Sequence, residues 1–252
     1  MIRNGGEMNK KTKEMLEYLK LTYLLKQWDE VIEQAEKNDQ SYDKFLKIII
    51  KNEFEDRSEV ARANRVKRAK IPNDFTMETY PFEDQPHLNR KRLLQRYDSL
   101  DYINKNRNLV FIGPSGTGKT GLASSVLRHA INSGHSGRFI EFSSLMEELL
   151  NSIADQSSKK VIKRYANYKC LLIDDLSFLE ADKAEIGLFY SLIQKRYKQS
   201  CTIITTPLGF SDWNKIFNNK QLTDALIGRL SDNGHIVNLK NCKVIRTEPD
   251  ID

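Results

Sequence analysis

Cysteine is scarce in this sequence. Its three cysteines, Cys170, Cys201 and Cys242, form no C-x-x-C pair. An odd number without that spacing argues against a disulfide framework and against a zinc site. We therefore expect buried thiols in a reducing compartment.

Long apolar runs are also missing. No apolar stretch approaches the ~18 residues that a membrane-spanning helix needs, and the residues after Met1, Ile-Arg-Asn-Gly-Gly-Glu, lack the apolar segment of a secretory signal. There is no internal repeat and no low-complexity segment. With 39% hydrophobic and 29% charged residues, the chain is expected to be soluble and cytoplasmic, with no membrane partner.

Proline is rare and unevenly placed. Three of the six prolines fall between residues 71 and 86, with aromatic residues between them, which indicates an ordered connector lying on the next domain. Before this segment, apolar residues recur at helical spacing from Lys10 onward. We expect a small helical N-terminal domain that binds DNA or a partner (1–70), a connector that begins the next domain (71–107), and a core domain (108–252).

The core domain alternates between two kinds of segment. Strands are expected at 108–112, 138–142, 170–173 and 201–205, and helices at 121–134, 144–154, 159–165 and 181–198. Strands separated by helices form a mainly parallel sheet covered on both faces. The predicted fold class is therefore α/β.

A complete phosphate-binding loop follows the first of these strands. The residues Gly113, Gly118, Lys119 and Thr120 match G-x-x-x-x-G-K-[ST], between an apolar run and a helical pattern. Such a loop directs backbone N–H groups and a helix N-terminus at a polyphosphate. The candidate nucleotide-binding residues are Gly113, Pro114, Ser115, Gly116, Thr117, Gly118, Lys119, Thr120 and Gly121.

Two adjacent carboxylates end a later apolar strand. The run Cys-Leu-Leu-Ile-Asp-Asp at 170–175 has the form of a Walker B element, in which the first Asp holds Mg²⁺ beside the loop hydroxyl. We therefore assign Asp174 and Thr120 to the metal, and Asp175 to activation of the attacking water. The expected ligands are ATP and Mg²⁺.

Two further positions are candidates for catalysis. Thr205 and Thr206 end the next strand, where a polar residue contacts the γ-phosphate or the attacking water, and we select Thr206; the alternative is an ordinary strand cap. Arg229 lies near a helix end, where an arginine finger would act if subunits assembled. Its alternative role is that of a structural charge.

A cluster of positive charge precedes the proline-rich connector. Residues 57–70 contain six basic residues and one acidic residue. A basic helix of this kind suits a phosphate backbone, although a solvated helix face has the same composition. The candidate DNA-binding residues are Arg62, Arg65, Lys67, Arg68 and Lys70.

Several motifs carry a resemblance that covers nearly the whole chain. They lie at 41–46 (Ser-Tyr-Asp-Lys-Phe-Leu), 53–57 (Glu-Phe-Glu-Asp-Arg), 69–72, 108–123, 171–176, 194–197 (Gln-Lys-Arg-Tyr), 210–213 and 225–230. With them the chain resembles the IstB helper ATPases of bacterial insertion sequences, which are similar to the DnaC helicase loaders and belong to the AAA+ class of P-loop NTPases. The resemblance implies an ATP-dependent homo-oligomer on double-stranded DNA that recruits the transposase of the same element.

The chain departs from the family pattern at four places. Asp174-Asp175 stands where the family usually has Asp-Glu, and Thr205-Thr206-Pro207 where it has Thr-Ser-Asn. Gly228-Arg229 replaces Asp-Arg, and only Arg246 remains near the end as a candidate second phosphate contact. Because the shorter Asp175 draws its carboxylate back by about 1.5 Å, ATP binding is expected to survive better than hydrolysis.

Three other functions share these features. A DnaC-like helicase loader would have the same core with an N-terminal domain that grips a helicase, but residues 41–72 favour the transposition family. A small-molecule kinase would need an arginine-rich lid after the core, whereas the sequence ends shortly after Arg229. A scaffold that binds nucleotide without hydrolysing it is the third alternative.

Overall fold

The computed structural model describes residues 8–72, 75–177, 183–217, 219–232 and 234–245. It divides into two compact units, residues 1–64 and 65–252. None of the helices in these described ranges combines the length and the apolar character that crossing a membrane requires.

The first unit is helical and has a small core. It contains α1 (Lys10–Leu19), α2 (Thr22–Lys37) and most of α3 (Tyr42–Ala69), which continues into the second unit. Leu16, Leu24 and Val31 form its buried centre. With so few buried apolar side chains, polar contacts add to what holds these helices together.

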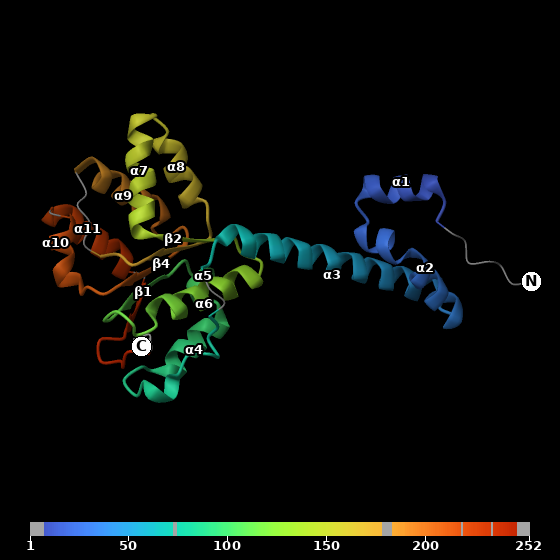
Figure 1. Ribbon diagram of the computed structural model, residues 1–252, viewed down its shortest axis with the longest axis horizontal. Coiled ribbons are helices and arrows are strands. Elements are labelled where there is room, and N and C mark those ends of the chain that lie inside the picture. Colours follow the sequence, from blue (N-terminus) through green and yellow to red (C-terminus); the bar gives the residue numbers. More distant parts are fainter. Residues whose placement is uncertain (1–7, 73–74, 178–182, 218, 233, 246–252) are drawn as a thin grey trace, which may run out of the picture. The chain divides into compact units, whose positions relative to one another are not determined.

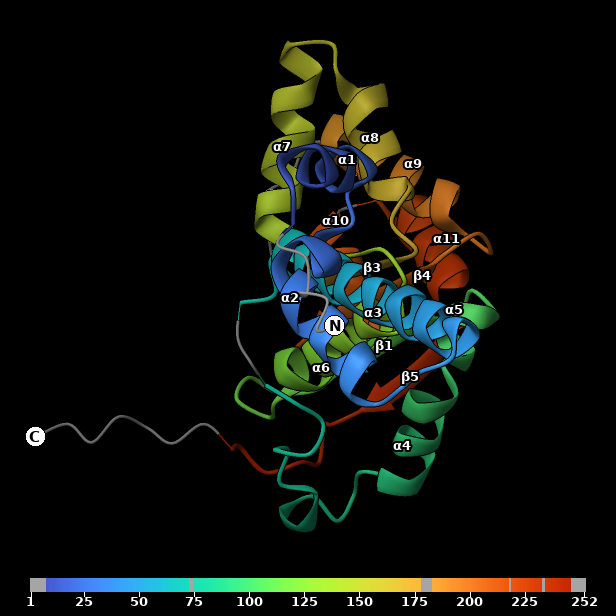
Figure 2. The same ribbon diagram turned by 90° about the vertical axis from the view of Figure 1, so that its right-hand side faces the viewer.

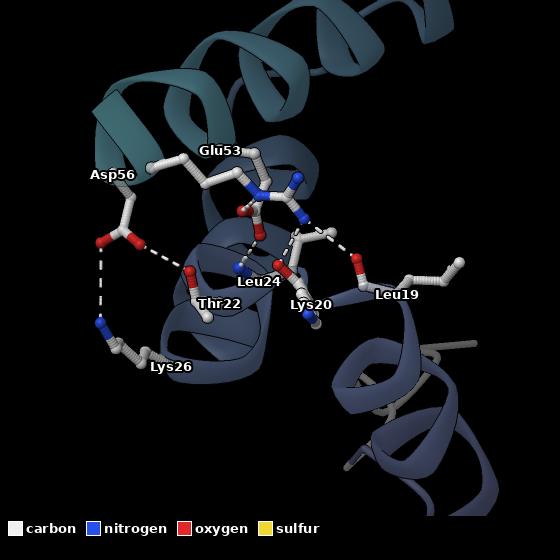
Figure 3. A network of polar contacts seen from close by, with 8 residues as sticks. Leu19, Lys20, Thr22, Leu24, Lys26, Glu53 and Asp56 are labelled. Carbon is white, nitrogen blue, oxygen red and sulfur yellow. Dashed lines mark hydrogen bonds and ion pairs between the residues drawn. The ribbon is translucent and has the colours of Figure 1, made fainter. Parts of the chain in front are cut away.

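Two carboxylates of α3 bind the start of α2. Glu53 accepts a hydrogen bond from the Leu24 amide at 3.0 Å, and Asp56 accepts one from the Thr22 hydroxyl at 2.6 Å (Figure 3). Lys26 forms an ion pair with Asp56 at 3.6 Å. These carboxylates satisfy donors at a helix N-terminus, where negative charge is favourable.

Arg57 binds the turn that precedes α2. Its guanidinium donates to the carbonyl oxygens of Leu19 at 3.0 Å and Lys20 at 2.5 Å. The Glu-Phe-Glu-Asp-Arg motif at 53–57 therefore supplies three side chains that hold the first unit together.

The second unit contains a five-stranded parallel sheet among its described residues. The strands are β1 (Asn108–Ile112), β2 (Gly137–Glu141), β3 (Cys170–Asp174), β4 (Cys201–Thr206) and β5 (Gly234–Asn238), in the order β2-β3-β4-β1-β5. Every neighbouring pair is parallel. The predicted α/β fold with a mainly parallel sheet is confirmed.

Helices cover both faces of this sheet. After α3, the helical segments of the described chain are η1 (Phe82–Asp84), α4 (Arg90–Ser99), α5 (Asp101–Asn104), α6 (Lys119–Asn132), α7 (Phe142–Ala154), α8 (Ser158–Ala166), α9 (Lys183–Arg196), η2 (Phe210–Asp212), α10 (Trp213–Phe217) and α11 (Lys220–Ser231). Figure 1 shows α4 to α6 on one side of the strands and α7 to α9 on the other. In the view turned by 90°, α4 and α7 again lie at opposite ends of this unit (Figure 2).

Side chains of the central strands alternate between two cores. Those that pack with α6 are Leu109, Phe111, Cys170, Leu172, Cys201 and Ile203. Those that pack with α7, α9 and α11 are Val110, Ile112, Leu171, Ile173 and Ile204. Because both faces are covered, every residue of β1, β3 and β4 is buried, and apolar side chains point to both sides of the sheet.

Candidate functional site

The phosphate-binding loop connects β1 to α6. Gly116 and Gly118 have φ angles of 79° and 82°, in the left-handed region that glycine adopts without steric cost. A Cβ atom on Gly118 would also lie 2.7 Å from the Tyr80 ring and from Ile245. The Tyr80 hydroxyl donates to the Thr117 carbonyl at 3.0 Å, which fixes the loop from outside.

Lys119 begins α6 and is almost fully buried. Its ammonium donates to the Pro114 carbonyl, within the same loop, at 2.7 Å. Burial lowers the pKa of Lys119, and the nearby Asp175 and Asp174 partly restore it. A buried ammonium at the N-terminus of a helix, behind a glycine-rich loop, suits an anionic ligand in the loop.

Asp174 joins the loop to the end of the sheet. Its Oδ2 accepts from the Thr120 hydroxyl at 3.1 Å, and its Oδ1 accepts from the Thr205 hydroxyl at 2.6 Å. Burial raises the pKa of Asp174, while these two hydroxyl groups lower it. The structure therefore brings together Thr120 and Asp174, the two residues predicted to hold a metal.

The donor set of this pair fits Mg²⁺, which prefers oxygen ligands and retains phosphate and water oxygens. Within the described ranges, no group of three or more His, Cys, Asp or Glu side chains could hold an ion alone. A metal at Thr120 and Asp174 would thus take its remaining ligands from a bound phosphate and water.

Asp175 lies beside Asp174 and is exposed to the cavity. Its φ angle is 54°, a left-handed conformation that Asp and Asn adopt more readily than other residues with a side chain. Its amide donates to the Thr205 hydroxyl at 2.9 Å.

These groups line a cavity of about 680 Å³, within the size range of ligand pockets. Its polar side is formed by Ser115, Gly116, Gly118, Lys119, Thr120, Gly121, Glu141, Ser143, Asp174, Asp175, Ser177 and Thr205. The loop residues and the two Asp residues were predicted from the sequence, and Thr205 was named there beside Thr206. Glu141, Ser143 and Ser177 were not predicted.

The cavity also has an apolar wall that sequence reasoning did not assign. This wall consists of Pro72, Phe75, Phe139, Phe142 and Ile245. The Phe75 ring lies against α6, where a Cβ atom on Gly121 would approach it to 2.8 Å. The prolines and aromatic residues of the 71–86 connector were the available signal, since they indicated a segment packed on the core.

The structure places two candidate catalytic residues away from this cavity. Thr206 is fully buried, and its hydroxyl donates to the Leu176 carbonyl at 2.6 Å. The Arg229 guanidinium lies over the Tyr190 ring, 4.7 Å from its centroid, and donates to the Ala225 carbonyl at 2.9 Å. Neither residue lines the cavity of its own chain. Arg246 lies outside the described residues.

The candidate DNA-binding residues differ in their contacts. In the first unit, Arg62 forms an ion pair with Glu59 at 2.5 Å. In the second unit, Arg65 donates to the Ile131 carbonyl at 3.3 Å. Lys67, Arg68 and Lys70 are exposed.

Comparison with known proteins gives consistent matches along most of the chain. A family model described as "IstB-like ATP binding protein" matches residues 14–248. The ATP-binding protein of insertion sequence IS232 from Bacillus thuringiensis subsp. berliner is 30% identical over 89% of this chain and 89% of its own length. The ATP-binding protein of insertion sequence IS21 from Pseudomonas aeruginosa is 27% identical over 90% of this chain and 85% of its own.

Solved structures are similar in the core. A DnaC helicase loader superposes with a TM-score of 0.54 at 21% identity, over 68% of this chain and all of that one. The AMPPCP-bound DnaA of Aquifex aeolicus gives a TM-score of 0.55 at 17% identity, over 68% of this chain and 51% of that one. At these identities the likeness establishes an AAA+ fold.

Proposed function

This chain belongs to the family of IstB-like ATP binding proteins, and from that premise we propose that it is an ATP-dependent DNA-binding helper of transposition. It binds ATP with Mg²⁺, assembles with copies of itself on double-stranded DNA, and recruits or stimulates the transposase of the same insertion sequence. The proposal rests on one observation above all: Lys119, Thr120 and Asp174 meet in one cavity at the phosphate loop.

The residues of the cavity have distinct roles in this proposal. The loop and Lys119 bind the phosphates, so that Lys119 exchanges its internal carbonyl partner for an anion. Thr120 and Asp174 hold Mg²⁺, which neutralises charge on the phosphates. The apolar wall around Phe75 excludes water and offers a flat surface to the base.

Hydrolysis is assigned to Asp175, whose exposed carboxylate orients and activates the attacking water. Its side chain is one methylene shorter than the usual Glu, so the turnover is proposed to be slow. Thr205, rather than Thr206, is the threonine of β4 that lines the cavity, where its hydroxyl donates to Asp174.

DNA binding is assigned to the basic residues that end α3. Lys67, Arg68 and Lys70 are exposed and can each neutralise a phosphate. Arg62 and Arg65 are included as weaker contributors, because each already has a partner within the protein.

A shared active site explains why Arg229 is remote from the cavity of its own chain. We propose that it reaches the ATP of a neighbouring copy as an arginine finger, which is worth about 10³- to 10⁵-fold in rate. Mixing inactive Arg229→Ala and Lys119→Ala proteins on DNA should then restore part of the activity. If co-assembled mixtures recover none at any ratio, the role of Arg229 is confined to contacts within its own chain, with Tyr190, Gln194 and Ala225.

A transposition role is favoured over helicase loading because the relatives that cover about nine tenths of the chain are insertion sequence proteins. The likeness to the DnaC helicase loader is confined to the fold. The test is capture with the purified, ATP-bound protein on duplex DNA, offered both the transposase encoded beside it and the replicative helicase of the host. Retention of the transposase alone is expected, and retention of the helicase alone would contradict the proposal.

A further inference from the structure

The hydroxyl group of Thr205 makes two hydrogen bonds that meet at the pair of carboxylates. It donates to Asp174 Oδ1 at 2.6 Å and accepts from the Asp175 amide at 2.9 Å. Thr205 is 1% exposed, so neither bond is exchanged for water at low cost. One side chain thus fixes the carboxylate of the first Asp and the backbone of the second.

The register of the sheet is the cause of this arrangement. The last paired residues of β3 and β4 are Ile173 and Ile204, so Asp174 and Thr205, the next residue of each strand, lie side by side. The Leu176 amide then donates to the Thr205 carbonyl at 2.8 Å. The chain after β3 is therefore held to the end of β4 on both sides of Asp175.

The two oxygens of Asp174 have different partners as a result. Oδ1 is taken by Thr205, and Oδ2 faces the Thr120 hydroxyl at 3.1 Å. Only Oδ2 is therefore directed at the threonine with which Asp174 is proposed to hold Mg²⁺. If the Oδ1 bond were absent, the carboxylate could rotate and both oxygens would compete for that position.

The Asp175 amide needs an acceptor because the backbone turns sharply there. At a φ angle of 54° the residue leaves the extended conformation of β3, and its N–H can no longer continue the strand pairing. The Thr205 hydroxyl supplies this acceptor. It thereby stabilises a backbone conformation that is unfavourable for any residue other than glycine. This turn is what exposes the Asp175 carboxylate to the cavity.

We propose that Thr205 is a positioning residue that sets the orientation of both Asp174 and Asp175 for Mg²⁺-dependent ATP hydrolysis. The inference rests on the proposed function, since it concerns how the same cavity acts. One hydroxyl group then aligns both carboxylates, which the chain needs because residue 175 is an Asp and not the longer Glu. The methyl group of Thr205 has no part in it.

The test compares Thr205→Val, which keeps the shape and removes both hydrogen bonds, with Thr205→Ser, which keeps both. ATP affinity is measured by calorimetry with Mg²⁺ and with EDTA, and kcat and KM are measured on DNA. Thr205→Val should bind ATP in EDTA as the parent does, lose most of the gain in affinity that Mg²⁺ brings, and lose at least about tenfold in kcat. For Thr205→Ser, the gain in affinity from Mg²⁺ and the kcat should both stay within about threefold of the parent's values.

The matched control is Thr202→Val, another buried threonine of β4, whose hydroxyl accepts from Arg196 at 3.0 Å. It should lower the melting temperature and leave the Mg²⁺-dependent gain unchanged. If Thr205→Val does not fold, Thr205→Ala takes its place with the same expectation.

Two results would overturn the inference. One is a Thr205→Val protein with the parental gain from Mg²⁺, and the other is a Thr205→Ser protein as impaired as Thr205→Val, which would assign the effect to packing. A parent that binds Mg²⁺-ATP without hydrolysing it would refute the proposed ATPase activity instead, and the affinity measurements would still decide the role of Thr205.

Discussion

Asp175 combines a strained backbone with an exposed carboxylate. Its φ angle of 54° is unusual outside glycine, and its amide is held by the Thr205 hydroxyl. A short polar side chain tolerates this conformation best. The Asp at this position therefore suits the turn, while its carboxylate lies about 1.5 Å further back than that of a Glu.

We expect Asp175→Glu to raise kcat about tenfold or more on saturating DNA, because the longer side chain brings the carboxylate to the attacking water. The left-handed backbone should cost about 1 kcal/mol of stability. Steady-state ATPase assays and thermal melts measure the two effects. The control, Asp175→Asn, keeps the length and removes the base, so it should be inactive.

A slower Asp175→Glu protein would contradict this account of the short acid. It would mean that the cavity is shaped for Asp, and that the turn at residue 175 matters more than the reach of the side chain.

The sequence alone could not decide whether Thr205 or Thr206 faces the site. Both were recognised as polar residues at the end of a strand, but successive strand residues point to opposite faces of a sheet. Which of them faces Asp174 depends on the register of β3 against β4, and a shift by one residue would exchange them. The loop residues needed no such information, because their spacing is local.

At the scale of elements, β1, β3 and β4 were predictable because each contains a short run of apolar or β-branched residues. The strand β5, Gly-His-Ile-Val-Asn, was missed because it lies at the edge of the sheet and is only partly buried. The apolar wall at Phe75 could not be located either, since it depends on how the connector folds back on α6.

Arg196 connects three elements of the second unit. It is 1% exposed, and its guanidinium donates to the carbonyls of Tyr165 at 2.8 Å and Tyr168 at 2.7 Å, and to that of Cys201. Burial lowers the pKa of Arg196 to about 10. The arginine of the Gln-Lys-Arg-Tyr motif thus joins the end of α9 to the segment before β3 and to the start of β4.

We expect Arg196→Met to lower the stability by about 2–4 kcal/mol, because several buried carbonyl groups lose their donor. For a unit of this size that is a fall of roughly 6–12 °C in melting temperature. The melting temperature of Arg196→Lys should lie between those of the parent and Arg196→Met, since one ammonium group cannot replace all the hydrogen bonds of a planar guanidinium. If Arg196→Met melts as the parent does, the hydrogen bonds of Arg196 do not stabilise this unit.

At the scale of the whole molecule, the positive charge is modest and local. The net charge is +6, yet Lys67 and Arg68 share the last turn of α3 and Lys70 follows it directly. Composition alone could not show where basic side chains gather, and the contacts of Arg62 and Arg65 could not be foreseen from a basic run.

We expect Lys67→Ala with Arg68→Ala to weaken DNA binding and to flatten the slope of log affinity against log salt by about two. Each residue that neutralises a phosphate releases counterions, so its loss changes the salt dependence as well as the affinity. Fluorescence anisotropy on a labelled duplex at several salt concentrations measures both. The matched control, Lys159→Ala with Lys160→Ala, removes two exposed lysines of α8 and should leave the slope unchanged. If the variant with Lys67→Ala and Arg68→Ala keeps the salt dependence of the parent, these two residues belong to a solvated surface that does not contact DNA.

The central claim is that the cavity at the phosphate loop binds ATP through Lys119, and calorimetric titration of Mg²⁺-ATP into the parent and Lys119→Ala tests it most directly. The account predicts one ATP bound per parent chain and an affinity at least about a hundredfold weaker in the variant, because a buried charge-assisted contact to phosphate is lost. Circular dichroism should show the same fold in both. Equal affinities for parent and variant would contradict the assignment of the site.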